Sequence, residues 1–347
     1  MPHLVPALRT TGPYSPFERT MIERREPRPR EVVIGIAYVG ICHSDIHTAR
    51  AEWGETIYPL VPGHEIVGTV TAVGRDATKY AVGDRVGVGC YVDSCRECVN
   101  CRNGEEQRCS KGTVFTYDCL DYDGNPTLGG YSKEIVVDQD YVLSLPDSLE
   151  MTVAAPLLCA GITLYEPLKR WGAGPGVKVA VVGMGGLGHI GVQIAHAMGA
   201  EVTVLSRSLA KADDGRRLGA DAYYATEDPE TFRVLDSRFD LIVSTVSGDL
   251  DVDAIVGLLG TGGVLVFVGM PPAPQSFQVK SLIGLRRCIA GSLIGSVAET
   301  QEMLDFCGAH GIGALVELVG ADDVDAVYDR VVAGHVRYRA VMDVATI

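Results

Sequence analysis

One segment, residues 177–206, restricts the fold more than any other part of the sequence. It reads VKVAVVGMGGLGHIGVQIAHAMGAEVTVLS: an apolar run, a glycine-rich turn, a helix-length stretch and a second apolar run. Similar apolar runs follow at 239–246 (FDLIVSTV) and 262–269 (GGVLVFVG), with helix-like segments between them. Strands that alternate with helices in this way are typical of α/β folds. We therefore expect a doubly wound parallel sheet in this half of the chain.

The glycines of this segment indicate what the sheet binds. Gly183, Gly185 and Gly188 spell G-x-G-x-x-G between the first strand and the helix. Alone, the pattern can mark nothing more than a tight turn. With a strand before it and a helix after it, the backbone can approach a pyrophosphate at the helix N-terminus. We expect a dinucleotide site that includes Gly183, Gly185, Gly186, Leu187 and Gly188.

The residues after the next strand bear on which dinucleotide binds. An NAD site usually places a carboxylate there, about 20 residues beyond the glycines, to bind the adenosine ribose. This sequence instead has Ser206, Arg207 and Ser208, with Lys211 close behind. Hydroxyls and cations can bind a 2′-phosphate by charge-assisted hydrogen bonds, whereas a carboxylate would repel it. NADP is therefore favoured; NAD remains the alternative if Arg207 and Lys211 only belong to a solvated face.

The rest of the chain predicts a second, discontinuous domain. From residue 31 to about 140, short β-branched runs alternate with glycine turns, which is typical of an antiparallel β domain. The tail returns to mixed structure and ends in the strand-like YRAVMDVAT. With 347 residues and 47% hydrophobic content, two domains are expected. We assign 1–152 with 291–347 to the β-rich domain and 153–290 to the dinucleotide-binding domain.

Charge and composition exclude several classes of protein. Thirty Lys and Arg against 44 Asp and Glu leave a net charge of −14, which argues against nucleic-acid binding. The N-terminus lacks the pattern of a signal peptide, and no stretch approaches the ~18 apolar residues of a membrane span. A cytoplasmic protein without a membrane segment is expected. Ten cysteines in a reducing compartment suggest metal binding or catalysis rather than disulfides.

Four of these cysteines stand close together, as C-x2-C-x2-C-x7-C. Cys95, Cys98, Cys101 and Cys109 lie in a loop with little apolar content of its own. Four thiolates at this spacing suit a closed tetrahedral zinc site that stabilises the loop. An iron centre is the alternative occupant, and free thiols are the alternative to a metal. The nearby Cys90 is expected to be a spectator.

A second group of possible metal ligands is scattered along the chain. Cys42 lies in GICHSDIH, His64 and Glu65 in PGHE, and Cys159 in LLCAG. Two thiolates and an imidazole would leave a fourth zinc position open for a substrate oxygen. Taken singly, a cysteine is more often a small apolar filler and a histidine a hydrogen-bonded structural residue. Spacing alone does not bring these residues together.

The motifs GICHSD, GHE, the four-cysteine loop, LLCAG and GMGGLG occur in the order found in zinc-containing medium-chain alcohol dehydrogenases, and the sequence resembles that family over nearly its whole length. The phrases GGYSKEIVV, GSLIGS and VRYRAVMDV are most similar to its cinnamyl alcohol dehydrogenase branch. The resemblance implies a GroES-like β-rich catalytic domain and a Rossmann cofactor domain, with the active site in the cleft between them. It further implies two zinc ions per chain, NADP(H), and a homodimer, with a tetramer as the alternative.

Residue roles follow from the resemblance by motif position. Cys42, His64 and Cys159 would hold the catalytic zinc, with Glu65 as an exchange ligand. Ser44 would hydrogen-bond the substrate oxygen and begin a proton relay that ends at His47, and Asp45 would orient His64. The remaining residues that it places at the cofactor are His43, Val268, Ser292, Ile294 and Arg339.

The expected activity is reversible hydride transfer between a primary alcohol and NADP. Relatives that act on cinnamyl substrates often carry tryptophan after the zinc loop; here Phe115 takes that place, and with Trp53 and Leu60 it is expected to line an apolar pocket. Aromatic or medium aliphatic aldehydes would then fit better than polyols. The alternatives are an NAD-dependent polyol or secondary-alcohol dehydrogenase of the same fold, and a non-enzymatic NADPH-binding or zinc-storage protein.

Overall fold

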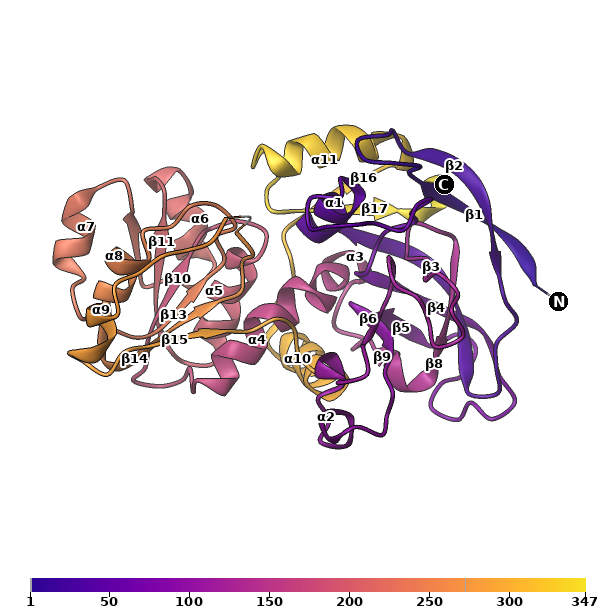
Figure 1. Ribbon diagram of the computed structural model, residues 1–347, viewed down its shortest axis with the longest axis horizontal. Coiled ribbons are helices and arrows are strands. Elements are labelled where there is room, and N and C mark those ends of the chain that lie inside the picture. Colours follow the sequence, from indigo (N-terminus) through magenta and orange to yellow (C-terminus); the bar gives the residue numbers. More distant parts are fainter. Residues whose placement is uncertain (1, 272) are drawn as a thin grey trace. The chain divides into compact units, whose positions relative to one another are not determined.

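The computed structural model describes residues 2–271 and 273–347 (Figure 1). The chain folds as two compact units, Met1–Cys159 with Gly295–Ile347, and Ala160–Ile294. These boundaries lie a few residues after the expected positions at 152/153 and 290/291. The predicted fold class is confirmed, because one unit is β-rich and the other is built on a parallel sheet.

A seven-stranded sheet forms the centre of the first unit, in the order β16-β17-β3-β4-β5-β9 with β8 also paired to β3. Apart from the parallel pair β16–β17, its strands are antiparallel. Two small sheets, β1–β2 and β6–β7, complete the unit. The strands are β1 (His3–Arg9), β2 (Glu18–Arg24), β3 (Glu31–Ile41), β4 (Ile66–Val73), β5 (Arg85–Val88), β6 (Tyr91–Asp93), β7 (Val114–Phe115), β8 (Glu134–Asp138), β9 (Leu143–Ser144), β16 (Val316–Val319) and β17 (Arg339–Asp343).

Strand β3 is the central strand of this unit. Its β-branched side chains are buried along most of its length. Glycine allows its neighbour to approach: a Cβ on Gly68 of β4 would lie 2.1 Å from the carbonyl oxygen of Gly35. The helices of the unit are α1 (His43–Ala49), α2 (Val99–Arg102), α3 (Met151–Ala154), α10 (Val297–His310) and α11 (Val324–Val332), with the 3-10 helix η3 (Ala155–Leu158) after α3.

Helix α10 shows how local sequence sets these boundaries. Ser296 caps its first turn by accepting a hydrogen bond from Glu299 N (3.1 Å), and the Glu299 side chain accepts one from Ser296 N (2.8 Å). At the other end Gly311 takes a φ of +65°, a left-handed conformation that glycine adopts without strain. The helix therefore begins and ends at signals that are present in the sequence.

The second unit contains a six-stranded parallel sheet in the order β12-β11-β10-β13-β14-β15. This is the doubly wound order, with a topological switch point between β10 and β13, where such sheets bind ligands. Its strands are β10 (Lys178–Val182), β11 (Glu201–Ser206), β12 (Ala222–Ala225), β13 (Phe239–Ser244), β14 (Leu259–Phe267) and β15 (Cys288–Gly291). Its helices are α4 (Ala160–Arg170), α5 (Gly188–Ala197), α6 (Ala212–Arg217), α7 (Pro229–Val234), α8 (Val252–Gly257) and α9 (Lys280–Ile283).

Apolar side chains of the strands and of α8 form the core of the second unit. Leu205, Phe239, Ile242, Ile255 and Leu265 are buried in one cluster. Such continuous apolar strands are expected where both faces of a parallel sheet are covered. The core fixes the carboxyl ends of the strands, where the predicted cofactor residues lie.

Within the described residues, no single helix has the length and hydropathy to cross a membrane, although α3–η3 and α4 pass that test when counted together as a bent pair.

Candidate active site

Antiparallel pairing brings the first candidate metal ligands together. Cys42 follows the end of β3, and His64 and Glu65 immediately precede β4, which pairs with β3 in antiparallel register. Gly40 N donates a hydrogen bond to Glu65 O (3.0 Å), which fixes the two strand ends side by side. Cys159 comes from the end of η3. One ligand atom from each of Cys42, His64, Glu65 and Cys159 lies within 4.8 Å of the others, and all four residues are buried.

Asp45, on the first turn of α1, organises this cluster from within the protein. Its carboxylate is fully buried and accepts hydrogen bonds from Cys42 N (2.9 Å), Gly63 N (3.1 Å) and His64 Nδ1 (3.0 Å). The last of these bonds leaves His64 Nε2 for a metal. Although burial opposes it, the Asp45 carboxylate helps to hold the pKa of His64 well above its ordinary value.

Glu65 forms a buried ion pair with Arg339, the first residue of β17. Glu65 Oε2 and Arg339 Nε have no hydrogen-bond partner among the described residues. Burial raises the pKa of Glu65 to about 8, although the Arg339 guanidinium opposes this. A Cβ on Gly40 would lie 1.9 Å from Glu65 Oε2, so this carboxylate occupies space that only glycine leaves free. Arg339, which the resemblance places at the cofactor, is only 4% exposed and is paired with Glu65.

This donor set fits zinc. Two thiols, an imidazole nitrogen and a carboxylate oxygen are the ligands that zinc takes in proteins, and three protein ligands with one exchangeable position are typical of catalytic sites. The unpartnered Glu65 Oε2 is a buried acceptor without a donor, which a cation would satisfy.

The predicted relay residues share helix α1 with Asp45. Ser44 Oγ lies 3.7 Å from Cys42 Sγ, so its hydroxyl borders the cluster. The His47 ring stacks on Trp53, with ring centroids 4.8 Å apart, and its Nδ1 hydrogen-bonds Glu52 Oε2 (2.5 Å). The exposed His43 lies 6.0 Å from His47 between ring centroids.

Two further residues, whose contacts the sequence did not indicate, lie beside the cluster. Tyr117 is buried with its ring centroid 5.7 Å from that of His64. Cys90, expected above to be a spectator, has its Sγ 3.9 Å from the carbonyl oxygen of Leu158, the residue before Cys159. Neither lies in a recognisable motif, so only the folded chain reveals these contacts.

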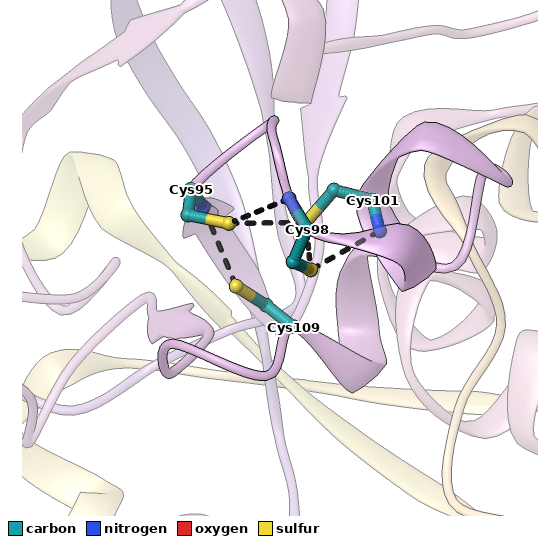
Figure 2. A group of neighbouring side chains, drawn as sticks. All are labelled: Cys95, Cys98, Cys101 and Cys109. Carbon is teal, nitrogen blue, oxygen red and sulfur yellow. Dashed lines mark hydrogen bonds between the residues drawn. The ribbon is translucent and has the colours of Figure 1, made fainter.

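The four-cysteine loop closes on itself, and its thiols point toward one another (Figure 2). The Sγ atoms of Cys98 and Cys101 are 3.4 Å apart, and those of Cys95 and Cys101 are 3.9 Å apart. Backbone amides support the sulfurs: Cys98 N donates to Cys95 Sγ (3.3 Å) and Cys95 N to Cys109 Sγ (3.4 Å). The loop brings the four predicted ligand atoms within 4.8 Å of one another, as a closed four-ligand metal site requires.

Backbone amides in this loop favour the thiolate form of Cys98. The backbone amide of Cys101, with that of Ser110, lowers the pKa of Cys98 to about 5. Ser94 Oγ lies 3.2 Å from Cys101 Sγ and 2.7 Å from the Tyr141 hydroxyl. The amide donors suit an anionic sulfur at Cys98, whereas burial raises the pKa of Cys101 to about 12 and its thiol donates to Ser94 Oγ.

The glycine turn of the second unit has the geometry of a phosphate cradle. Gly183 has a φ of +99°, and a Cβ on Gly188 would lie 1.8 Å from the Gly183 carbonyl oxygen. A Cβ on Gly185 would meet nothing within 4 Å, so the backbone is open there. Gly186 and Leu187 complete the turn, and α5 begins at Gly188. The arrangement exposes backbone amides at a helix N-terminus, where an anion binds favourably.

The basic residues after β11 lie beside this turn. Val182 and Leu205 are register partners, so β10 and β11 end at the same edge of the sheet. Lys211 Nζ donates a hydrogen bond to the carbonyl of Met184 within the glycine turn (2.9 Å). Ser206 ends β11, and Arg207 and Ser208 follow it at the surface. The fold thus brings the four predicted phosphate-binding residues to the edge that carries the glycine turn.

The other predicted cofactor residues follow the neighbouring strands. Val268 comes after β14 and Ser292 after β15, and these strands are parallel neighbours. Ser292 Oγ donates a hydrogen bond to the buried Glu166 (2.5 Å), and the side chain of Ile294 is buried.

The three predicted pocket residues have different local surroundings. Trp53 stacks on His47, whereas Leu60 is buried, with its backbone paired to Thr10. Phe115 is exposed in β7, which pairs with β6. Exposed aromatic surface at Trp53 and Phe115 remains available to a ligand.

Comparisons with known proteins agree with this geometry. The model of the alcohol dehydrogenase GroES-like domain matches residues 28–147, and that of the zinc-binding dehydrogenases matches residues 186–309. The chain is 60% identical to a probable formaldehyde dehydrogenase, AdhA, of Bacillus subtilis over 95% of both chains. It is 56% identical to the NADP-dependent alcohol dehydrogenase C of Mycobacterium tuberculosis over 96% of both.

Solved structures extend the likeness to the fold. A cinnamyl alcohol dehydrogenase of Sorghum bicolor superposes with a TM-score of 0.96 at 40% identity, covering 99% of this chain and 98% of that one. One from Helicobacter pylori, solved with NADP(H), gives a TM-score of 0.94 at 42% identity and covers 99% of each chain. The chain therefore belongs to the zinc-dependent, medium-chain alcohol dehydrogenase family of oxidoreductases.

Proposed function

We propose that this chain is an NADP-dependent alcohol dehydrogenase and aldehyde reductase that transfers hydride reversibly between a primary alcohol and the cofactor. The observation that carries the proposal is the convergence of Cys42, His64 and Cys159, with Glu65 beside them, in one buried cluster. Cys95, Cys98, Cys101 and Cys109 would hold a second, structural zinc ion.

Different side chains would bind the metal, orient its ligands and transfer the proton. Zinc held by Cys42, His64 and Cys159 would supply Lewis acidity toward the oxygen of an alcohol or aldehyde. Asp45 keeps His64 in the tautomer that presents Nε2. Ser44 Oγ, at the edge of the cluster, would take the hydroxyl proton of an alcohol while it passes its own proton on toward His47, and the reverse transfer would supply the proton when an aldehyde is reduced. His47, partly exposed on the same helix, exchanges that proton with solvent.

Glu65 acts as a reserve ligand. While it is paired with Arg339 its Oε1 is occupied, and the unpartnered Oε2 is the atom that can approach the metal. Substrate exchange requires a fourth ligand that comes and goes, and a carboxylate already inside the cluster can fill that position.

NADP rather than NAD is the proposed cofactor. Ser206, Arg207, Ser208 and Lys211 supply hydroxyls and positive charge beside the glycine turn, and several close relatives are named NADP-dependent. Gly183, Gly185, Gly186, Leu187 and Gly188 would cradle the pyrophosphate, and the remaining cofactor contacts proposed are His43, Val268, Ser292, Ile294 and Arg339.

Replacing Arg207 by Asp tests the cofactor assignment. It removes a charge-assisted hydrogen bond and adds a repelling carboxylate, so kcat/KM with NADPH should fall about 10- to 100-fold. The same quantity with NADH should stay level or rise. A fall of equal size with both cofactors would contradict the assignment. Arg238→Asp is a matched control, because Arg238 pairs with Glu201 at the opposite end of β11.

The substrate test uses a panel of aldehydes with NADPH. The panel includes benzaldehyde, cinnamaldehyde, hexanal and formaldehyde, the last because the Bacillus subtilis relative is a probable formaldehyde dehydrogenase. With Trp53, Leu60 and Phe115 as the proposed pocket residues, aromatic and medium aliphatic aldehydes should be favoured over polyols. Metal-loaded protein that turns over none of the panel would refute the function, and Cys42→Ser should abolish turnover while Cys119→Ser leaves it unchanged.

A homodimer through the second unit is the proposed assembly, with a tetramer as the alternative. Strand β15 is an edge strand, paired only with β14 in its sheet. Three apolar side chains that precede or follow β15 in the sequence, Val279, Ile283 and Leu293, are exposed, with Ile283 71% exposed. An unpaired edge beside exposed apolar surface is a natural site of association. Light scattering should give twice the chain mass, and Ile283→Glu should shift the protein toward a monomer.

The cytoplasm is the proposed location, supported by ten cysteines that are all free thiols. Fractionation of the native cells with an antibody to the chain should recover it with cytoplasmic markers.

A further inference from the structure

The segment that follows β7 carries two anchoring side chains in succession. The ring of Tyr117 lies beside that of His64, a candidate metal ligand, with ring centroids 5.7 Å apart. The next side chain contacts a distant part of the chain: Asp118 Oδ1 accepts a hydrogen bond from Ile57 N (2.7 Å), across 61 residues of sequence. Phe115, two residues before Tyr117, is exposed. This segment therefore connects the metal cluster, an aromatic residue of the proposed pocket and a second stretch of backbone.

The donor of this hydrogen bond belongs to the loop that follows α1, residues 50–60, which we call the Trp53 loop. Trp53 is 43% exposed on it. Two side chains bind the loop back to α1: the hydroxyls of Thr56 and Tyr58 donate to the carbonyls of the last two residues of that helix, both at 2.9 Å. The Asp118 carboxylate ties the same loop to the segment after β7, so the loop is held from two sides.

The backbone is in a left-handed conformation on both sides of this contact. Asp118 has a φ of +54°, and so does Ala51 near the start of the Trp53 loop. Aspartate adopts this conformation more readily than most residues, whereas alanine keeps it only where the surrounding contacts enforce it. Asparagine and glycine also tolerate it, so either can replace Asp118 without new backbone strain.

We propose that Asp118 is a positioning residue that determines how well the enzyme accepts aldehydes with an extended apolar tail. The inference rests on the proposed function and narrows its substrate class. Trp53 and Phe115, two of the proposed pocket residues, lie on the two segments that Asp118 joins. With the hydrogen bond in place, a tail that packs on these rings meets a surface that is already ordered, so binding costs less conformational entropy. A one-carbon aldehyde has no tail and gains nothing from this order.

A role in stability alone would have a different consequence. If the hydrogen bond only strengthened the fold, its loss would lower the activity toward every aldehyde by the same factor, through the fraction of folded enzyme. Ordering of the Trp53 loop instead changes the activity toward long substrates relative to short ones. The informative quantity is therefore the ratio of kcat/KM for cinnamaldehyde to kcat/KM for formaldehyde.

The test compares the zinc-loaded wild-type enzyme with three variants, using NADPH. Asp118→Gly removes the acceptor and keeps the left-handed backbone; because Asp118 is partly exposed, the core stays intact. Asp118→Asn keeps a carbonyl acceptor for Ile57 N. Ser237→Gly is the control, because Ser237 is exposed, has the same φ of +54° and lies in the second unit, before β13.

In Asp118→Gly the cinnamaldehyde-to-formaldehyde ratio should fall about 10-fold, as expected for one lost hydrogen bond to a charged acceptor. The fall should come mainly from a higher KM for cinnamaldehyde, while kcat/KM for formaldehyde hardly changes. Asp118→Asn should restore the ratio toward that of the wild type, and Ser237→Gly should leave it unchanged.

Tryptophan fluorescence tests the contact without turnover. The chain has two tryptophans, so Trp53 is the only emitter once Trp171 is replaced by phenylalanine. In that background, acrylamide should quench the emission more strongly with Asp118→Gly than with Asp118 or Asp118→Asn, because the freed loop exposes the ring more often.

Three results would overturn the inference. In Asp118→Gly these are an unchanged ratio, an equal fall with both aldehydes, or unchanged quenching of Trp53. If the wild type reduced neither aldehyde, the proposed function would fail and the specificity role with it. The wild-type rates alone distinguish this failure from the other three results.

Discussion

Replacing Asp45 by asparagine keeps the size of the side chain and removes its charge. Asp45 Oδ1 accepts from both Gly63 N (3.1 Å) and His64 Nδ1 (3.0 Å), whereas Oδ2 accepts from Cys42 N (2.9 Å). An asparagine can keep its carbonyl oxygen toward the first two donors. Its NH₂ group would then face the amide of Cys42, so that two donors meet and the backbone N–H is left unpaired.

The cost follows from burial, because no water reaches this carboxylate. Losing a hydrogen bond to a charged acceptor costs about 1.5–3 kcal/mol, and an unsatisfied buried donor about 1–3 kcal/mol more. We expect a loss of about 3–5 kcal/mol in the unfolding free energy of the first unit. Because the His64 ring would also lose its anionic partner, zinc affinity at the catalytic site should fall about 10- to 100-fold.

The assay combines urea unfolding of the metal-free protein with chelator competition for zinc. Asp123→Asn provides the matched control, because Asp123 is an exposed carboxylate paired with Arg28 and should change neither quantity much. A zinc affinity in Asp45→Asn within twofold of the wild type would refute the orienting role. An unchanged urea midpoint would refute the claim that the hydrogen bonds of Asp45 stabilise the first unit.

Three further predictions follow from single contacts. Gly188→Ala would place a Cβ 1.8 Å from the Gly183 carbonyl, so the turn must shift; dinucleotide affinity should fall at least about 10-fold by calorimetry, with zinc content unchanged. Cys98→Ser should lower the thermal midpoint by several degrees and remove about one zinc per chain by elemental analysis. Although partial burial opposes it, Lys79 helps to hold the pKa of Asp140 below its usual range. A depressed carboxylate pKa stabilises the fold above the unfolded-state pKa, so Asp140→Asn should cost about 0.5–1 kcal/mol at pH 7 and almost nothing near pH 2 in urea titrations.

Local patterns allowed much of this fold to be predicted. The segment 177–206 folds as β10, the glycine turn, α5 and β11, because each element carries its own periodicity and its own breaker residues. The four-cysteine loop was equally predictable, since its ligands are neighbours along the chain and a short loop can hardly keep them apart.

The catalytic cluster could not be predicted from spacing. It depends on the antiparallel pairing of β3 with β4 and on the end of η3, and no local rule states which strands pair. Only the family resemblance joined Cys42, His64 and Cys159. Glu65 and Arg339 are 274 residues apart in sequence, and their ion pair exists only in the folded chain.

Contacts that depend on shape were beyond sequence reasoning as well. Nothing in the pattern indicates that Gly40 makes room for a buried carboxylate, or that Cys90 rests against η3. The side chain of Leu60 is buried, and its place in the pocket stays a prediction, because pocket walls depend on how loops pack.

The most direct test of the central claim is a crystal structure of the purified protein with anomalous differences measured at the zinc absorption edge. The account predicts two peaks per chain, one within the four-cysteine loop and one bonded to Cys42 Sγ, His64 Nε2 and Cys159 Sγ. A single peak confined to the loop, in protein that reduces aldehydes at full rate, would contradict it.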